Sequence, residues 1–278
     1  MRALAVHPDV LVVVSRVWQT TAALVRAPAP PDAPSGPGAA TTPREAFLVD
    51  SPVYPDELEL TAQVAGQAGF SVAGLLATHG DWDHLLGPLA FPQAALGVAE
   101  TTAARLTGHS GQAVREMRAF DAEHYVARER GPGLGDVQAL PVPGKLELGA
   151  GDGDDGSGER HELELHAADG HTGDGMAVWV PWARVLLCGD YLSPVEIPTW
   201  HDADGSRSAY RATLDRLRPL VEQADWVVPG HGGPIDAARA LAIWREDVAY
   251  VEDWTLPIAR RDAAQQALHE RNRAALGA

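Results

Sequence analysis

The sequence is poor in cysteine, in basic residues and in long apolar runs, and each shortage excludes a class of protein. The single cysteine, Cys188, excludes an intramolecular disulfide and a cysteine-based zinc site, and its setting in "VLLCGD" predicts a small buried residue of a strand. With 22 basic against 38 acidic residues, the net charge of -16 disfavours nucleic acid and anionic membranes as partners. No window approaches the roughly 20 apolar residues that a transmembrane helix needs.

The first residues also lack the pattern of an export signal. Arg2 is their only basic residue, and His7-Pro8-Asp9 interrupts the apolar stretch. We therefore expect a cytoplasmic protein that acts on a small molecule. The 278 residues, 45% of them apolar, suffice for a single large α/β domain over residues 1–278. The sequence indicates no particular oligomeric state.

Strand and helix patterns alternate in two halves, which favours a layered α/β domain. Strands are predicted within residues 9–27 (two strands), 45–50, 72–77, 145–149, 161–168, 176–180, 184–190 and 225–230. Helices are predicted over residues 55–70, 100–128 (with breaks near Gly108 and Gly111), 208–224 and most of 235–273.

Two segments are too rich in Pro, Gly, Ala or Asp to build a core. Residues 28–43 predict a mobile loop between strands, and residues 150–159 predict an acidic, Gly-rich hairpin tip. The tip contains Gly151-x-Gly153-x-x-Gly156, which matches a dinucleotide fingerprint. Carboxylates lie inside that match and no helix follows it, so we interpret it as part of the tip. We expect both segments to lie away from the functional site.

The chemistry-bearing residues stand in four loops, each directly after a predicted strand, where functional residues tend to be placed. Imidazole nitrogens and carboxylate oxygens are the ligands that divalent metals prefer, and neighbouring glycines let a loop bend sharply. Each motif is weak evidence on its own, but all four in order predict a metal site. They are His79-Gly-Asp81-Trp-Asp83-His84, Gly170-His171-Thr172-Gly173, Gly189-Asp190 and Pro229-Gly230-His231-Gly232.

This series resembles the metallo-β-lactamase superfamily over roughly residues 10–235. The family usually shows His-x-His-x-Asp-His, then Gly-His-Thr after a strand pair, Gly-Asp after Leu-Leu, and a late Gly-His. The resemblance implies an αββα sandwich with two divalent metal ions at one edge, zinc being favoured and iron or manganese the alternatives. It further implies three ligand groups: His79 and His171 for the first metal, Asp83, His84 and His231 for the second, and Asp190 bridging both.

Three positions depart from the family pattern. Asp169 replaces the usual Pro and Asp174 the usual Ser around Gly-His-Thr, both at turn positions. The third, Asp81 in place of the second His, bears directly on the metal. If Asp81 coordinates, three carboxylates face two divalent cations, which should make the metal a weaker Lewis acid and raise the pKa of its water. Oxygen donors also favour harder metals such as iron or manganese.

Two functions follow from the resemblance. The favoured one is a metallo-hydrolase in which a metal-bound hydroxide attacks a small ester, thioester or lactone. Asp83 would then orient the nucleophile, and Tyr191 would donate to the oxyanion unless it only packs. The alternative is a di-iron oxidoreductase with the same cage, since some family members with a Glu at the position of Asp81 are di-iron proteins.

A third reading, a metal-bound module without activity, is disfavoured because every other ligand position is intact. A true β-lactamase is disfavoured by the missing export pattern. Further candidates for the pocket wall are Trp82, Trp200 and His201, with simple packing as the alternative for Trp82.

Overall fold

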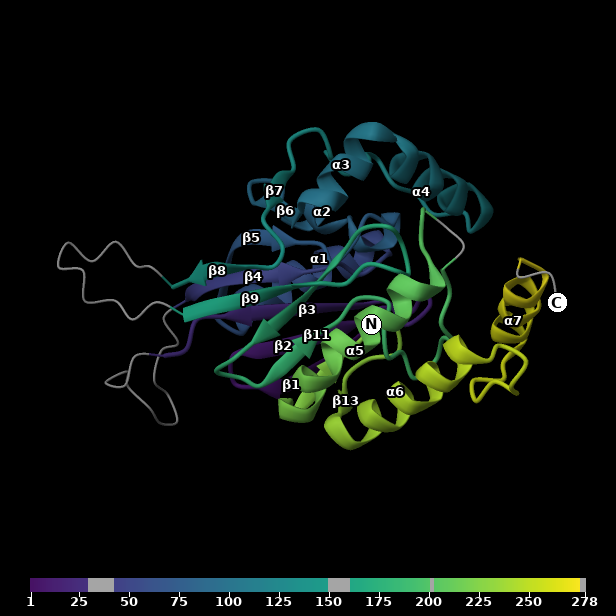
Figure 1. Cartoon of the computed structure of the whole chain (residues 1–278). Coiled ribbons are helices and arrows are strands. Elements are labelled where there is room, and N and C mark those ends of the chain that lie inside the picture. The colour runs from purple at the N-terminus through teal and green to yellow at the C-terminus, as the bar shows by residue number, and fades with distance from the viewer. Residues whose placement is uncertain (30–42, 150–160, 201–202, 276–278) are drawn as a thin grey trace.

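The computed structural model describes residues 1–29, 43–149, 161–200 and 203–275, and these form two β-sheets packed between helices (Figure 1). The first sheet has its strands in sequence order: β1 (Arg2–His7), β2 (Val10–Val14), β3 (Thr21–Arg26), β4 (Arg44–Val49), β5 (Phe70–Leu76), β6 (Ala95–Ala99) and β7 (Gln138–Leu140). The second sheet has the order β13 (Ile235–Asp236), β12 (Trp226–Val228), β11 (Val185–Leu187), β10 (Met176–Val180), β9 (His161–Ala167) and β8 (Gly144–Leu148).

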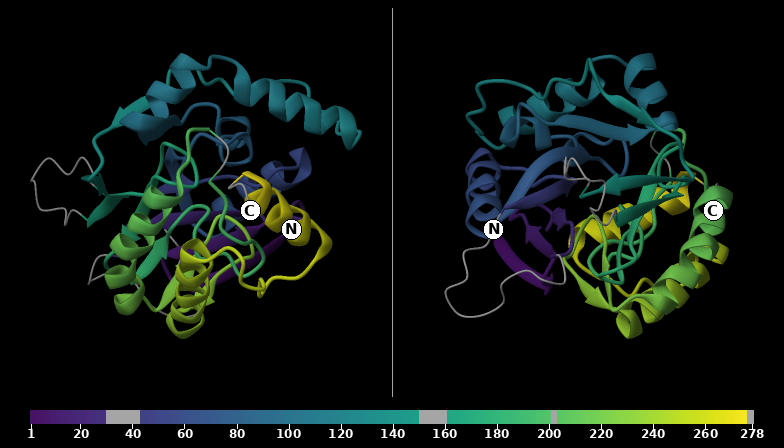
Figure 2. Two further views of the ribbon diagram at one scale, coloured as in Figure 1. Left: turned by 45° about the vertical axis from the view of Figure 1, so that its right-hand side comes forward. Right: turned by 90° about the vertical axis from the view of Figure 1, so that its left-hand side faces the viewer.

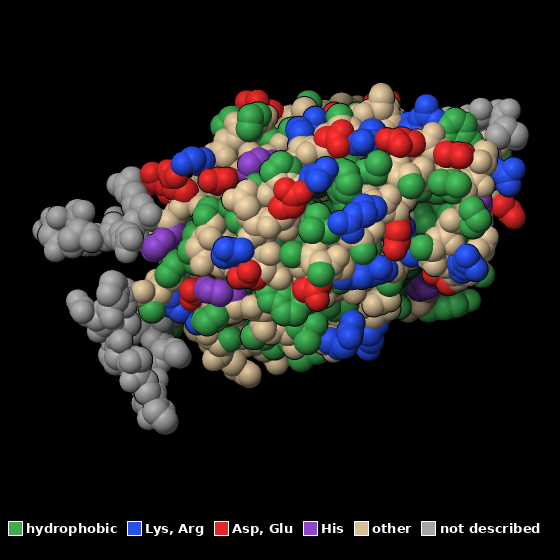
Figure 3. All heavy atoms as spheres, turned by 60° about the horizontal axis from the view of Figure 1, so that its bottom comes forward, with side chains coloured by type: hydrophobic (Ala, Val, Ile, Leu, Met, Phe, Trp, Pro, Cys, Tyr) green, Lys and Arg blue, Asp and Glu red, His purple; other side chains and the backbone are tan. Residues whose placement is uncertain are grey.

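The helices connect and cover these sheets. They are α1 (Pro55–Gln67), α2 (Gly87–Ala90), α3 (Glu100–Gly108), α4 (Gln112–Glu123), α5 (Arg207–Gln223), α6 (Ala237–Glu252) and α7 (Ala263–Ala275), with a 3₁₀ turn at Trp82–His84. In the described part of the chain, no helix is long and apolar enough to cross a membrane. On the face seen in Figure 3, acidic and basic side chains are interspersed among hydrophobic ones.

The apolar residues of neighbouring strand positions point into different layers, because side chains alternate across a strand. In β10, Val178 belongs to the core between the two sheets, whereas Trp179 packs with the core under α5 and α6. In β3, Val25 faces the inter-sheet core and Leu24 the core under the other helices. Figure 2 shows the resulting helix–sheet–sheet–helix order. The predicted αββα architecture is confirmed.

Most predicted elements match the observed ones, and the differences have local causes. The helix predicted over 55–70 ends at Gln67, because Gly69 adopts a positive φ of 75° and Phe70 already begins β5. The break predicted near Gly111 is real, since this glycine has a φ of 78° just before α4. The sequence does not predict β1, β6, β7 or β13: β1 is largely exposed, β7 and β13 are short, and β6 is built from Ala, Leu, Gly and Val.

Three sequence predictions fall on residues outside the described ranges. They concern residues 30–42 of the Pro-rich loop, the whole hairpin tip 150–159, and His201. The predicted burial of Cys188 is confirmed. It lies just after β11, and its thiol donates to the carbonyl of Tyr191 at 3.2 Å.

Candidate metal centre

The first motif is a tight turn after β5. It is held in place by the side chain of Asp50, the residue after β4. The Asp50 carboxylate accepts hydrogen bonds from the backbone N–H of Thr78 at 2.8 Å and from its hydroxyl at 3.0 Å. Its Oδ2 also lies 3.2 Å from Nδ1 of His84. The strand β5 therefore delivers His79, and the following 3₁₀ turn delivers Asp83 and His84, to one place.

The other three loops arrive from the second sheet. His171 lies between β9 and β10, Asp190 follows β11, and His231 follows β12. The parallel pairing of β11 with β12 places the last two loops side by side. Their approach requires a glycine at position 230, because a Cβ there would lie 2.0 Å from Oδ1 of Asp190.

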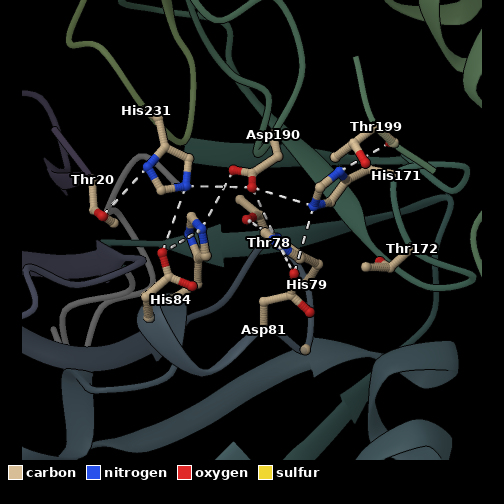
Figure 4. Close-up of polar contacts among 12 residues, drawn as sticks. Thr20, Thr78, His79, Asp81, His84, His171, Thr172, Asp190, Thr199 and His231 are labelled. Atoms are coloured by element: carbon tan, nitrogen blue, oxygen red, sulfur yellow. Dashed lines mark hydrogen bonds and ion pairs between the residues drawn. The ribbon is translucent and has the colours of Figure 1, made fainter. Parts of the chain in front are cut away.

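The four loops bring Asp190 to the centre of a cage of four imidazoles (Figure 4). The Nε2 atoms of the four histidines each lie between 3.3 and 3.7 Å from an oxygen of Asp190. These rings come from residues up to 152 positions apart in the sequence, from 79 to 231. The four histidines are His79, His84, His171 and His231.

The remaining two carboxylates divide the cage into halves. Oδ2 of Asp81 lies 3.4 Å from Nε2 of His79 and 3.5 Å from Nε2 of His171. Oδ2 of Asp83 lies 3.6 Å from Nε2 of both His84 and His231. These are the two groups that the family resemblance implies, with Asp81 added to the first.

The outward nitrogens of three cage histidines face hydrogen-bond partners in the protein, and that of His84 lies against the Asp50 carboxylate without a hydrogen bond. Nδ1 of His79 lies 3.1 Å from the Thr78 hydroxyl, and Nδ1 of His171 lies 3.3 Å from the Thr199 carbonyl. Nδ1 of His231 lies 3.2 Å from the carbonyl of Trp18. Such partners fix ring orientation and leave Nε2 for a metal.

The donor set fits divalent metals. Ligands 2.0–2.2 Å from a tetrahedral ion lie roughly 3.3–3.6 Å apart, close to the observed N···O separations of 3.3 to 3.7 Å. Among the described residues, the buried atoms that lack a hydrogen-bond partner include Nε2 of His79, Nε2 of His84 and Oδ1 of Asp190. Buried polar atoms are normally satisfied, so these orphaned atoms point to a cation as their partner.

Neighbouring carboxylates raise the pKa of three cage histidines against the effect of burial. Burial alone would lower the pKa of His171, but a hydrogen bond to Asp81 and the charge of Asp190 raise that pKa to about 9. Burial is likewise outweighed at His231, where Asp190 and Glu196 raise the pKa to about 10. The neighbouring carboxylates also raise the pKa of His84 well above its usual value.

The structure revises the charge assigned to the cage from the sequence. Two further carboxylates stand behind the ligands: Asp50 against His84, and Asp174, whose Oδ2 accepts from the backbone N–H of Gly80 at 2.9 Å. A guanidinium, Arg105, pairs with both Asp174 and Asp81. With Glu196, which lies 3.9 Å from Nδ1 of His231, six carboxylates and one guanidinium carry a formal net charge of minus five, and two divalent cations would offset four of these charges.

Tyr191 does not occupy the place of an oxyanion donor. Its side chain is buried, and its hydroxyl donates to the carbonyl of Asp169 at 2.7 Å and accepts from the backbone N–H of His171 at 2.9 Å. The predicted catalytic role does not fit this geometry, because the hydroxyl is committed to backbone groups. Tyr191 instead fixes the loop that carries His171. Trp200 is similarly buried in the core beneath α5 and α6.

Trp82 lies between an aromatic cluster and the cage. Its ring centroid lies 5.8 Å from that of Trp18 and 5.1 Å from that of Phe120. These two neighbours line an open cavity of about 570 Å³, together with Arg16, Val17, Tyr54 and His124. The carbonyl of Trp18 faces Nδ1, the outward nitrogen of His231, so Trp18 contacts both this cavity and the back of one cage histidine.

Four residues of the site escaped the sequence reasoning. Asp50 stands at the end of a predicted strand, as the ligands do, and that position could have revealed it. Glu196, whose Oε1 lies 3.9 Å from Nδ1 of His231, follows the bridging aspartate in an irregular segment. Arg105 and the carbonyl of Trp18 carry no such signal, since one is a helical arginine and the other is a backbone group.

The comparisons with known proteins point in one direction. The sequence profile of the metallo-beta-lactamase superfamily matches residues 40–231. The DIM-1 metallo-β-lactamase is similar in structure, with a TM-score of 0.56 at 17% identity over 90% of this chain and 96% of that chain. A metallo-β-lactamase from Pontibacter korlensis gives 0.57 at 17% identity, over 91% and 99%.

A further similar structure is that of TTHA1623 in a di-iron-bound form. Its TM-score is 0.58 at 21% identity, over 82% of this chain and 96% of that chain. All three identities are low, so these structures support the fold and do not define the substrate or the metal.

Proposed function

The chain belongs to the metallo-β-lactamase superfamily, and from this premise we propose that it is a metal-dependent hydrolase of small esters, thioesters or lactones. The observation that carries the proposal is the central position of Asp190, within 3.3 to 3.7 Å of all four imidazoles. One carboxylate touching two separate histidine pairs is the arrangement that a bridging ligand of two metals requires. We propose zinc as the favoured occupant.

Two divalent ions, when bound, would activate a water molecule at neutral pH and polarise the scissile carbonyl. The protein's own groups would do the rest. His79, Asp81 and His171 would hold one ion, Asp83, His84 and His231 the other, and Asp190 both. Asp83 would in addition orient the attacking water and accept its proton.

The aromatic cavity supplies a place for the apolar part of the substrate. It is lined mainly by rings, including Trp18 and Phe120, and the carbonyl of Trp18 contacts the outward nitrogen of His231. Cavities of a few hundred cubic ångströms lined by aromatic groups suit small organic molecules. We therefore propose a small-molecule substrate. The cytoplasmic location expected from the sequence is kept as a separate proposal.

The test starts from purified protein. Metal content is measured first, and matched ester, thioester and lactone substrates are then assayed with zinc, manganese and iron reconstituted separately. We expect two metals per chain and turnover of at least one of the three substrate classes. Asp190→Asn should abolish both metal binding and turnover. Two retained metals with no hydrolysis of any class would refute the hydrolase.

The alternative is a di-iron oxidoreductase, and one observation favours it. Oδ2 of Asp81 lies 3.4 and 3.5 Å from the two histidines of the first half, which gives that half an oxygen donor where the family usually has nitrogen. An iron-loaded protein would absorb in the near ultraviolet and consume oxygen or a peroxide, whereas a zinc protein would do neither.

A further inference from the structure

We propose that Arg105 is a positioning residue that makes Asp81 a ligand of the first metal in place of the family's second histidine. The inference rests on the proposed metal cage. It concerns metal binding, and it does not depend on which reaction the cage performs.

The first step is that the two carboxylate oxygens of Asp81 have different partners. Nη2 of Arg105 donates to Oδ1 at 2.6 Å, a short charge-assisted hydrogen bond. Oδ2 points the other way, toward Nε2 of His79 and His171. An aspartate is shorter than a histidine, so its carboxylate must be held at one orientation to serve as a ligand. Arg105 supplies that restraint and leaves a single oxygen for the metal.

The second step is that Arg105 is itself held on both sides. Its Nη1 donates to Oδ1 of Asp174 at 2.8 Å, and the other oxygen of Asp174 accepts from the backbone N–H of Gly80 at 2.9 Å. Asp174 is almost fully buried, and the Arg105 side chain is only 15% exposed. The guanidinium therefore forms a fixed bridge between the loop of Asp81 and the loop of Asp174.

The third step explains the glycine in "HGD". A Cβ at Gly80 would lie 3.1 Å from Nη1 and 3.2 Å from Cδ of Arg105, and 3.2 Å from Oδ2 of Asp174. Any side chain there would crowd the bridge. Two departures from the family pattern, Asp81 and Asp174, thus belong to one unit, because both carboxylates bind the same guanidinium.

The test measures metal retention without any substrate, so a failed search for hydrolysis does not affect it. Wild type and variants are equilibrated against buffered free zinc, and metal per chain is counted. Cobalt-loaded samples report the ligand geometry by their visible absorption. We expect Arg105→Gln to weaken the first metal about 10- to 100-fold while the second is retained. Arg115→Gln, at an exposed helical arginine away from the cage, is the matched control.

Two further variants separate positioning from a structural role. Arg105→Gln leaves the buried Asp174 unpaired, so the double variant Arg105→Gln/Asp174→Asn removes that charge and should fold while still losing the first metal. Arg105→Lys should retain only part of the affinity for the first metal, because a single ammonium group cannot bridge two carboxylates as the guanidinium does. In an Asp81→His background, where imidazole replaces the carboxylate, Arg105→Gln should weaken the first metal by less than about threefold, since no carboxylate is left there to be oriented.

The outcomes are distinct. Equal loss of metal on Arg105→Gln in the wild-type and Asp81→His backgrounds would show that Arg105 acts on the fold alone and would overturn the proposal. Unchanged first-site affinity in a folded Arg105→Gln protein would overturn it too, as would a wild type with no first-site metal. Wild type that binds both metals but hydrolyses nothing would count only against the hydrolase.

Discussion

Acidification should expel the metals steeply, because protons and metal ions compete for the same nitrogens. In the metal-free protein, burial opposes protonation, but the carboxylates raise the pKa of His171 to about 9 and of His231 to about 10. They also raise the pKa of His84 well above its usual value. His171 and His231 should therefore be protonated at pH 7 in the metal-free protein, and each must lose its proton before Nε2 can bind a cation.

The two halves of the cage differ in the number of protons that they must release. The first half contains His171, so its dissociation constant should fall about tenfold per pH unit, or about 1.4 kcal/mol, between about pH 7 and 9. The second half contains His231, whose pKa of about 10 predicts a tenfold dependence per pH unit, and the raised pKa of His84 should make that dependence steeper. Loading both metals at pH 7 should release about two protons or more per chain.

The assay is competition with a chromogenic chelator at half-unit steps from pH 6.5 to 9. Calorimetry in buffers of different ionisation enthalpy then counts the protons released. Total release of fewer than one proton per chain at pH 7 would refute the reasoning, since it would mean that the rings are already neutral in the metal-free cage. A second site that responds to pH no more steeply than the first would contradict a raised pKa at His84.

The same pKa values set the sign of the stability change in the metal-free protein. A histidine whose folded pKa lies above its unfolded value of about 6.5 stabilises the fold fully below that pH, and this stabilisation is lost as the pH rises through the folded value. The chelator-treated protein should therefore melt at a lower temperature at pH 10 than at pH 7. A rise in melting temperature over this range would contradict the protonated cage.

Three further predictions concern single residues. Asp81→His should keep two metals and shift the metal preference toward zinc, and the acidic limb of its pH–rate profile should move down by on the order of one pH unit. Asp81→Ala should instead lose the first metal. Unchanged metal content in Asp81→Ala would exclude Asp81 as a ligand. Gly230→Ala should displace Asp190, because the new Cβ would lie 2.0 Å from its Oδ1, and metal per chain should fall at both sites while circular dichroism stays unchanged. Arg260→Met should leave the buried Asp247 without its partner, which donates to it at 2.6 Å, and should lower the free energy of unfolding in urea by about 3–5 kcal/mol. The double variant Arg260→Met/Asp247→Asn should recover most of that stability.

The architecture and the candidate ligands could be predicted from local sequence. Apolar runs with period two or 3.6 predicted most strands and helices, because local periodicity follows directly from burying one face of an element. The loops of candidate ligands were visible because each loop follows a strand and contains a glycine. His79 after β5 and His231 after β12 are of this kind, and the structure brings them into one cage.

The groups behind the ligands could not be predicted, because they depend on tertiary packing. Arg105 lies 24 residues from Asp81 and 69 from Asp174, and a helical arginine carries no sign of its partners. The sequence likewise does not reveal that the hydroxyl of Tyr191 is engaged by two backbone groups, the N–H of His171 and the carbonyl of Asp169. The local sequence indicates which residues are candidate ligands. The orientation of each candidate ligand and the charges around it depend on which distant side chains the folded layers bring into contact with it.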